Sequence, residues 1–145
     1  MPGKASLEAN QYYAHPRNLF WQLMVEILGL PELDYAARCQ ALKDSGIALW
    51  DVLDSCERPS SLDNDIDPAS IQVNAIGELL DQHASIALIA FNGAMAEKLF
   101  RRHIDETHYS ERRLLRLPST SPANAGIPRE EKLRQWRQIL RPLPD

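Results

Sequence analysis

The segment SIALIAFNGAMAEKLF, at positions 85–100, changes its hydrophobic pattern at Asn92-Gly93. Residues 85–91 are almost continuously apolar, which is typical of a strand that is buried on both faces. After Gly93, apolar side chains recur at helical spacing as far as Phe100. The segment therefore predicts a buried strand that turns directly into a helix.

The same two patterns alternate along the rest of the chain. They predict helices at 19–28, at 34–46, at 71–83 and from Pro128 onward, buried strands at 46–53 and 114–117, and loops at 57–70 and 118–127. In the last helix, Leu133, Trp136 and Leu140 are expected to share one inward stripe. Alternating strands and helices favour an α/β protein, a three-layer α/β/α sandwich around a short parallel sheet. The length of 145 residues fits a single domain over residues 1–145.

The charge is distributed unevenly. The net charge is −4, but residues 98–145 hold eleven of the 16 Lys and Arg and six of the 20 acidic residues. This basic third could face an anionic partner, and the alternative is a set of solvated helix faces. The two cysteines cannot form a disulfide framework, which predicts reduced thiols in a cytoplasmic protein. The apolar runs are too short to span a membrane, and the histidines lack metal-ligand spacing.

In parallel α/β folds, ligands bind at the carboxyl ends of the strands. That rule selects the segment before the first helix, the segment from Trp50 to Arg58, the turn at Asn92-Gly93, and the segment from Ser119 to Asn124. Asp51, at the expected end of a strand, could line a pocket or cap a turn. Asn92 could cap the following helix or hold its amide rigidly toward a base edge.

The segment QYYAHPRN at positions 11–18 contains two aromatic rings, an imidazole, a guanidinium and two amides, which are side chains that can bind a ligand. The aromatic rings of Tyr12 and Tyr13 can stack on a nucleobase, and side-chain amides can hydrogen-bond one. His15 adds a possible charged donor. The alternative for Asn18 is an N-cap of the helix that starts beside it.

A second polar segment, PSTSPANA at 118–125, follows the predicted strand at 114–117. Small hydroxyls, backbone N–H groups outside helices and sheets, and prolines that fix the chain suit a rigid grip on phosphates. Ser119 and Ser121 are the candidate phosphate ligands. The alternative is an ordinary connection between a strand and a helix.

Taken together, these segments resemble the hypoxanthine-DNA (deoxyinosine) glycosylase family of the uracil-DNA glycosylase superfamily. The resemblance covers most of the chain and is carried by residues 2–3, 5–7, 11–13, 15–21, 46–53, 55–56, 61–63, 91–93 and 117–124. It implies hydrolysis of the N-glycosidic bond of a deaminated base in DNA, either hypoxanthine or the related uracil or xanthine. The enzyme would be monofunctional, would leave an abasic site, and would need neither metal nor cofactor.

The resemblance also implies residue roles. Asn18 matches the catalytic asparagine of the family's His-Pro-x-Asn segment, where it would hold the attacking water or hydrogen-bond the leaving base. Asn124 matches the second motif and would donate to the anionic base. The remaining roles are base stacking by Tyr12 or Tyr13, base-edge contact by Asn92, assistance by His15, pocket lining by Asp51, and phosphate binding by Ser119 and Ser121.

The family pattern starts with an interior strand and a Gly-Ser/Thr-x-Pro-Gly turn, and residues 1–3 supply only the tail of that turn, so the first strand is expected to be missing from this chain. Its absence would leave backbone groups of two neighbouring strands unpaired. The alternatives to a working enzyme for hypoxanthine are a non-catalytic DNA-binding remnant and a glycosylase specific for uracil or a mismatch. A structural or interaction domain is the alternative outside DNA repair.

Overall fold

The computed structural model describes residues 13, 17–30, 34–51, 53–57 and 67–140, with the backbone alone at 53–57 and 67–72. The elements are α2 (Phe20–Leu28), α3 (Tyr35–Asp44), β1 (Leu53–Glu57), β2 (Asp67–Val73), α4 (Ile76–Gln82), β3 (Leu88–Asn92), α5 (Ala94–His103), η2 (Glu106–His108), β4 (Arg113–Leu117), α6 (Arg129–Trp136) and η3 (Arg137–Leu140). None of the helices in this part of the chain is both long and apolar enough to cross a membrane.

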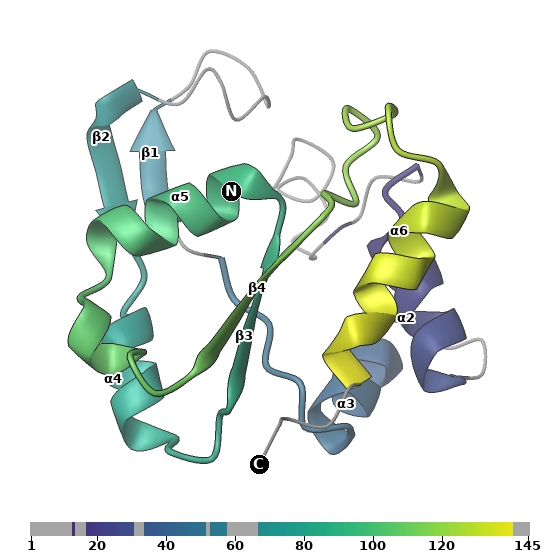
Figure 1. Ribbon diagram of the computed structural model, residues 1–145, viewed down its shortest axis with the longest axis horizontal. Helices are drawn as coiled ribbons and strands as arrows, with labels where there is room; N and C mark the ends of the chain where they lie inside the picture. The colour runs from purple at the N-terminus through teal and green to yellow at the C-terminus, as the bar shows by residue number, and fades with distance from the viewer. Residues whose placement is uncertain (1–12, 14–16, 31–33, 52, 58–66, 141–145) are drawn as a thin grey trace.

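The centre of the molecule is the parallel pair β3 and β4 (Figure 1). Their register runs from Leu88 opposite Arg113 to Asn92 opposite Leu117, so both strands end at the same edge. Successive side chains of a strand point to opposite faces, and β4 sends Leu114 to one hydrophobic cluster and Leu115 to another. The predicted α/β fold is confirmed, with helices on both sides of the strands.

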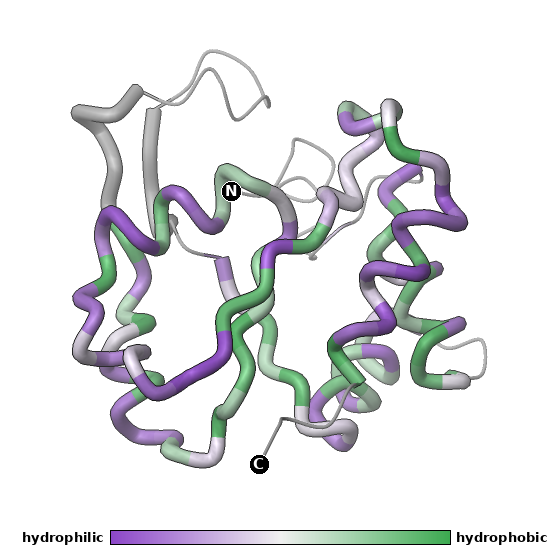
Figure 2. Tube along the Cα trace, in the orientation of Figure 1, coloured by the Kyte–Doolittle hydropathy of each residue, from purple (hydrophilic) through white to green (hydrophobic). Residues whose placement is uncertain are grey.

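The two clusters have different helices. One cluster joins Phe91 of β3 to Phe100 of α5 and Leu80 of α4, and the ring centroids of Phe91 and Phe100 lie 5.0 Å apart. The other joins Leu117 to α2, α3 and Trp136 of α6. In Figure 2 the paired strands are largely hydrophobic, whereas α5 and α6 carry many hydrophilic residues.

The helices at 20–28 and 35–44 form where the sequence predicts them. Gly29 adopts a φ of 66°, the left-handed conformation that ends many helices. The Asp34 carboxylate accepts a hydrogen bond from the N–H of Ala37 at 2.8 Å and caps the second helix. Leu42 is buried, and Cys39 packs against the same cluster.

The segment from residue 46 to residue 83 differs from the prediction. Residues 47–51 form no strand in the described chain, although Ile47 and Leu49 pack against the core around α2. The strand lies later than predicted, as β1 at Leu53–Glu57, and it pairs antiparallel with β2, which spans the end of the predicted loop and the start of the predicted helix; α4 begins only at Ile76. Ile71 and Val73 alternate with polar residues, a period of two that fits a strand better than a helix.

The end of the chain contains a second correction. Trp136 is buried and Leu133 packs nearby, but Leu140 is 52% exposed. The helix tightens to a 3-10 turn after Trp136, which changes the angular spacing, so that Ile139 packs against the core in its place.

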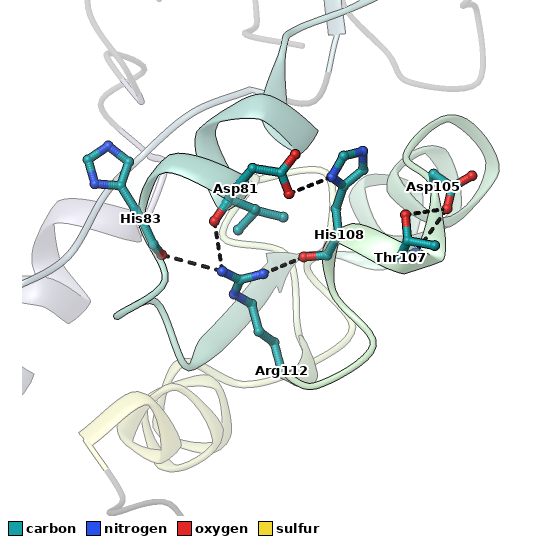
Figure 3. A network of polar contacts seen from close by, with 7 residues as sticks. Asp81, His83, Asp105, Thr107, His108 and Arg112 are labelled. Carbon is teal, nitrogen blue, oxygen red and sulfur yellow. Dashed lines mark hydrogen bonds and ion pairs between the residues drawn. The ribbon is translucent and has the colours of Figure 1, made fainter.

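Arg112 joins the segment just before β3 to α4 and η2 (Figure 3). The guanidinium of Arg112 donates to the carbonyls of Ile86 at 2.7 Å and Leu80 at 2.8 Å, and also to the carbonyl of His108. The His108 ring is 2.8 Å from the Asp81 carboxylate, which raises the pKa of the imidazole. These contacts fix the end of the sheet opposite the carboxyl ends of the strands.

Candidate active site

The segment 118–124 after β4 is held by its own hydrogen bonds. The Ser119 hydroxyl oxygen accepts from the N–H of Ser121, and the Ser121 hydroxyl oxygen accepts from the N–H of Ala123, both at 3.2 Å. The carbonyl of Ser121 accepts from the N–H of Asn124 at 3.0 Å. The N–H groups of Ser121, Ala123 and Asn124 are therefore engaged, contrary to the expectation that the N–H groups of this loop are free for phosphates, whereas the hydroxyl hydrogens of Ser119 and Ser121 are available as donors.

Thr120 joins this segment to two other parts of the chain. Its side chain is fully buried, and its N–H and hydroxyl oxygen pair with the Asn92 amide, with both contacts at 2.9 Å. Its carbonyl accepts from the N–H of Leu19 at 3.0 Å. One buried threonine thus fixes the end of β3, the loop after β4 and the entry to α2 relative to one another.

Asn92 therefore holds the loop instead of capping α5. The N-cap of α5 is Gly93, whose φ is 98°, and no side chain caps that helix. The N–H of Gly93 donates to the carbonyl of Leu117 at 3.0 Å, and a Cβ on Gly93 would lie 3.1 Å from the Cβ of Ser119. Glycine is required there because both the backbone angle and the close approach of the loop disfavour a side chain.

Asn18 lies one residue before the bond that joins Leu19 to the loop. Its amide oxygen accepts from the N–H of Phe20, the first residue of α2, at 3.0 Å, although the N-cap position itself is Leu19. The bond also settles the orientation of the amide, because an N–H needs an oxygen as its acceptor. Within the described chain the amide nitrogen of Asn18 has no acceptor, so it is available as a donor to a ligand.

Asn124 and Lys132 hold the end of the 118–124 loop. The Asn124 amide donates to the carbonyl of Ser119 at 3.2 Å, and the Asn124 carbonyl accepts from the ammonium of Lys132 at 2.7 Å. Lys132 is only 3% exposed, and burial lowers the pKa of its ammonium. The indole N–H of Trp136 donates to the carbonyl of Pro118 at 2.8 Å and holds the other end of the loop.

Two further candidates, Tyr13 and Asp51, have contacts of their own. Tyr13 adopts a φ of 56°, and its ring stacks on Phe20 with centroids 4.2 Å apart. Asp51 precedes β1, so the expectation that it ends a strand is wrong, and its carbonyl accepts from the Asn74 amide at 2.8 Å. Tyr12 and His15 lie outside the described residues.

The chain matches two curated proteins from Methanosarcina species. It is 31% identical over 146 residues to a hypoxanthine DNA glycosylase of Methanosarcina acetivorans, covering 97% of this chain and 86% of that protein. The chain belongs to the hypoxanthine DNA glycosylase family. A second member, from Methanosarcina barkeri, is 37% identical over 95 residues, covering 64% of this chain and 59% of that protein. A search of family models found no match.

A solved structure supports the same conclusion. A solution NMR structure of a proposed uracil DNA glycosylase from Methanosarcina acetivorans superposes with a TM-score of 0.75 at 29% identity, covering 95% of this chain and 83% of that one. Together with the hypoxanthine DNA glycosylase relatives, it supports a DNA glycosylase function for the chain.

Sequence reasoning does not identify two residues that organise this member of the hypoxanthine DNA glycosylase family. Thr120 lies between two candidate serines, and nothing local indicates its burial. Lys132 carries a signal, since it lies four residues before the buried Trp136 and therefore on the inward face of α6. No group of three or more His, Cys, Asp or Glu in the described chain could hold a metal ion.

Proposed function

We propose that the protein hydrolyses the N-glycosidic bond of hypoxanthine in DNA and leaves an abasic site without cutting the strand. The observation that carries the proposal is the Thr120 junction, which brings Asn18, Asn92 and the 118–124 loop to the carboxyl ends of two parallel strands. Membership in the hypoxanthine DNA glycosylase family supplies the class of reaction. The target nucleotide leaves the base stack to reach this edge.

Asn18 acts on the leaving base through its amide nitrogen. Breaking the bond develops negative charge on the base, and a positioned donor stabilises that charge. The amide oxygen of Asn18 already accepts from the N–H of Phe20, which holds the side chain and leaves the nitrogen as the donor. An amide is not a general base near neutral pH, so Asn18 does not deprotonate the attacking water.

Asn124 is the second donor to the base. One of its amide hydrogens is used by the carbonyl of Ser119, which leaves one for a ligand. Lys132 is a positioning residue that acts through Asn124, because its ammonium holds the Asn124 carbonyl from within the protein. A buried cation behind this loop also favours negative charge in front of it.

The loop binds the DNA backbone through hydroxyl hydrogens. The oxygens of Ser119 and Ser121 accept from loop N–H groups, so each O–H can donate to a phosphate oxygen. The base pocket is completed by ring stacking from Tyr13 or Tyr12, by the second amide hydrogen of Asn92, and by His15 and Asp51 at its margin. A single domain and a cytoplasmic location stay predictions.

Uracil is the second candidate base, favoured by the likeness to the proposed uracil DNA glycosylase. The test uses duplexes that carry one hypoxanthine, one uracil or no lesion, followed by alkali to cut abasic sites. Faster cleavage at hypoxanthine than at uracil, lost in Asn18→Ala, is the expected result. Faster cleavage at uracil would make uracil the preferred base instead of hypoxanthine. Binding without cleavage at either base would identify a non-catalytic DNA-binding protein.

A further inference from the structure

A buried carboxylate on α5 holds two arginines at once. Glu97 is 9% exposed; its Oε1 accepts from Nε of Arg116 at 2.5 Å, and its Oε2 accepts from Nε of Arg101 at 3.1 Å. The bond from Arg116 is the main reason that the pKa of Glu97 is lowered. A buried ionised carboxylate is costly unless it is paired with a positive charge, so Glu97 holds both guanidiniums in place and the three side chains act as one unit.

Both arginines remain accessible to a ligand. The side chain of Arg116 is 62% exposed and that of Arg101 is 51% exposed, while Arg116 uses Nε on Glu97 and Arg101 uses Nε and Nη2, which leaves terminal N–H groups on both. One negative charge is shared between two positive charges, so the unit has a net positive charge. On α6 the pairing is one to one, since Arg129 pairs with Glu26 and Arg134 with Glu131.

The arginine pair lies beside the proposed active site. The N-cap of α5 is Gly93, which contacts the 118–124 loop at Ser119, and Glu97 lies about one turn further along the chain. Arg116 immediately precedes Leu117 at the end of β4 and is opposite Phe91 in the parallel ladder. In Figure 1, α5 leads away from this edge on the side of the sheet opposite α6.

We propose that Arg101 and Arg116 bind backbone phosphates of the DNA beside the target nucleotide, with Glu97 fixing their orientation. The inference rests on the proposed function and adds the path of the DNA, which passes over α5 and not over α6. A guanidinium offers paired donors that match a phosphate, and an arginine held in place loses less side-chain entropy on binding.

The test measures the affinity for undamaged and hypoxanthine-containing duplexes over a range of salt concentrations by fluorescence anisotropy. Each phosphate contact contributes about −0.9 to the slope of log affinity against log salt. Between about 50 and about 200 mM salt, wild-type affinity should therefore fall about threefold more than that of Arg101→Gln or Arg116→Gln. The loss should be equal for both duplexes, because phosphate contacts carry no sequence information.

Arg134→Gln is the matched control, since that exposed arginine is paired with its own glutamate on α6 and should keep the wild-type slope. If Arg116→Gln does not fold, Arg101→Gln carries the test, because it removes the longer of the two contacts, at 3.1 Å, and leaves Glu97 paired with Arg116. Wild-type affinity and slope in Arg101→Gln, or an equal loss in Arg134→Gln, would overturn the inference. Arginine-dependent binding without base release would refute the proposed reaction and leave the DNA path standing.

Discussion

The Thr120 junction predicts a specific consequence for Thr120→Val. Valine keeps the shape of threonine and keeps the N–H that donates to the Asn92 oxygen, but it removes the hydroxyl oxygen that accepts from the Asn92 nitrogen at 2.9 Å. The residue is fully buried, so water cannot replace the lost acceptor. Leaving a buried donor unpaired costs about 1–3 kcal/mol.

That magnitude can be measured in two ways. The free energy of unfolding in urea should fall by about 1–3 kcal/mol, and the melting temperature should fall by a few degrees for each kcal/mol. Base release in a single turnover should slow by about tenfold or more, because the Asn92 amide keeps only one of its two bonds to residue 120 and holds the loop that positions Asn124 less firmly. Both effects come from one contact and should appear together.

Thr120→Ser is the control for this prediction. Serine keeps the hydroxyl acceptor and loses only a methyl group, which costs about 1 kcal/mol in a buried site. It should release base at nearly the wild-type rate, although it is somewhat less stable. Equal rates in the serine and valine variants would show that the hydroxyl does not organise the site and would refute the reasoning.

Three further predictions concern the residues around the site and the opposite end of the sheet. Lys132→Met should slow base release about tenfold while changing stability little, since burying an ammonium costs about as much as its bond returns; single-turnover rates and urea unfolding check this. Gly93→Ala should cost about 1–2 kcal/mol through its φ of 98°, whereas Gly126→Ala, with nothing within 4 Å, should not. The raised pKa of His108 makes its pair with Asp81 stabilising below about pH 6.5, and this stability is lost as the pH rises through the folded-state pKa. The melting temperatures of wild type and Asp81→Asn should therefore differ most at acidic pH and converge once the pH exceeds the folded-state pKa of His108. A difference in melting temperature that does not change with pH would contradict this.

Local signals in the sequence predict the parts of the fold that are formed by neighbours in the chain. The helix at 20–28 has a continuous apolar face and a glycine at its end, and the β3–α5 unit combines an apolar run with an Asn-Gly turn. Each of these depends on residues a few positions apart. Their agreement with the structure follows from short-range periodicity and capping.

The parts that the sequence does not predict depend on distant partners. Residues 47–51 have the composition of a buried strand, but a strand also needs a hydrogen-bonding neighbour, which composition does not supply. The pairing of β1 with β2 likewise is not visible in the polar residues of Asp67–Val73. A continuous apolar run therefore predicts that a segment is buried, but it does not predict that the segment pairs with another strand.

The candidate site shows the same division. Asn18 and Asn124 could be selected from their motifs, and their half-buried amides lie on the loops that Thr120 and Lys132 hold. The pairing of Asn92 with Thr120 spans 28 positions, so the sequence alone could not distinguish a base-reading amide from one that fixes a loop. The hydrogen bonds made by the N–H groups of the 118–124 loop likewise could not be predicted from the sequence, because they depend on the backbone angles of the loop.

Asn18→Asp tests the central claim most directly. Aspartate keeps the oxygen that accepts from the N–H of Phe20, so the protein should unfold at nearly the wild-type denaturant concentration, but it removes the amide hydrogen offered to the leaving base. The measurement is the single-turnover rate of abasic-site formation at hypoxanthine, with urea unfolding alongside. The account predicts that Asn18→Asp is stable and releases base at least about a hundredfold more slowly, as expected for the loss of a transition-state donor; release by this variant at the wild-type rate would contradict it.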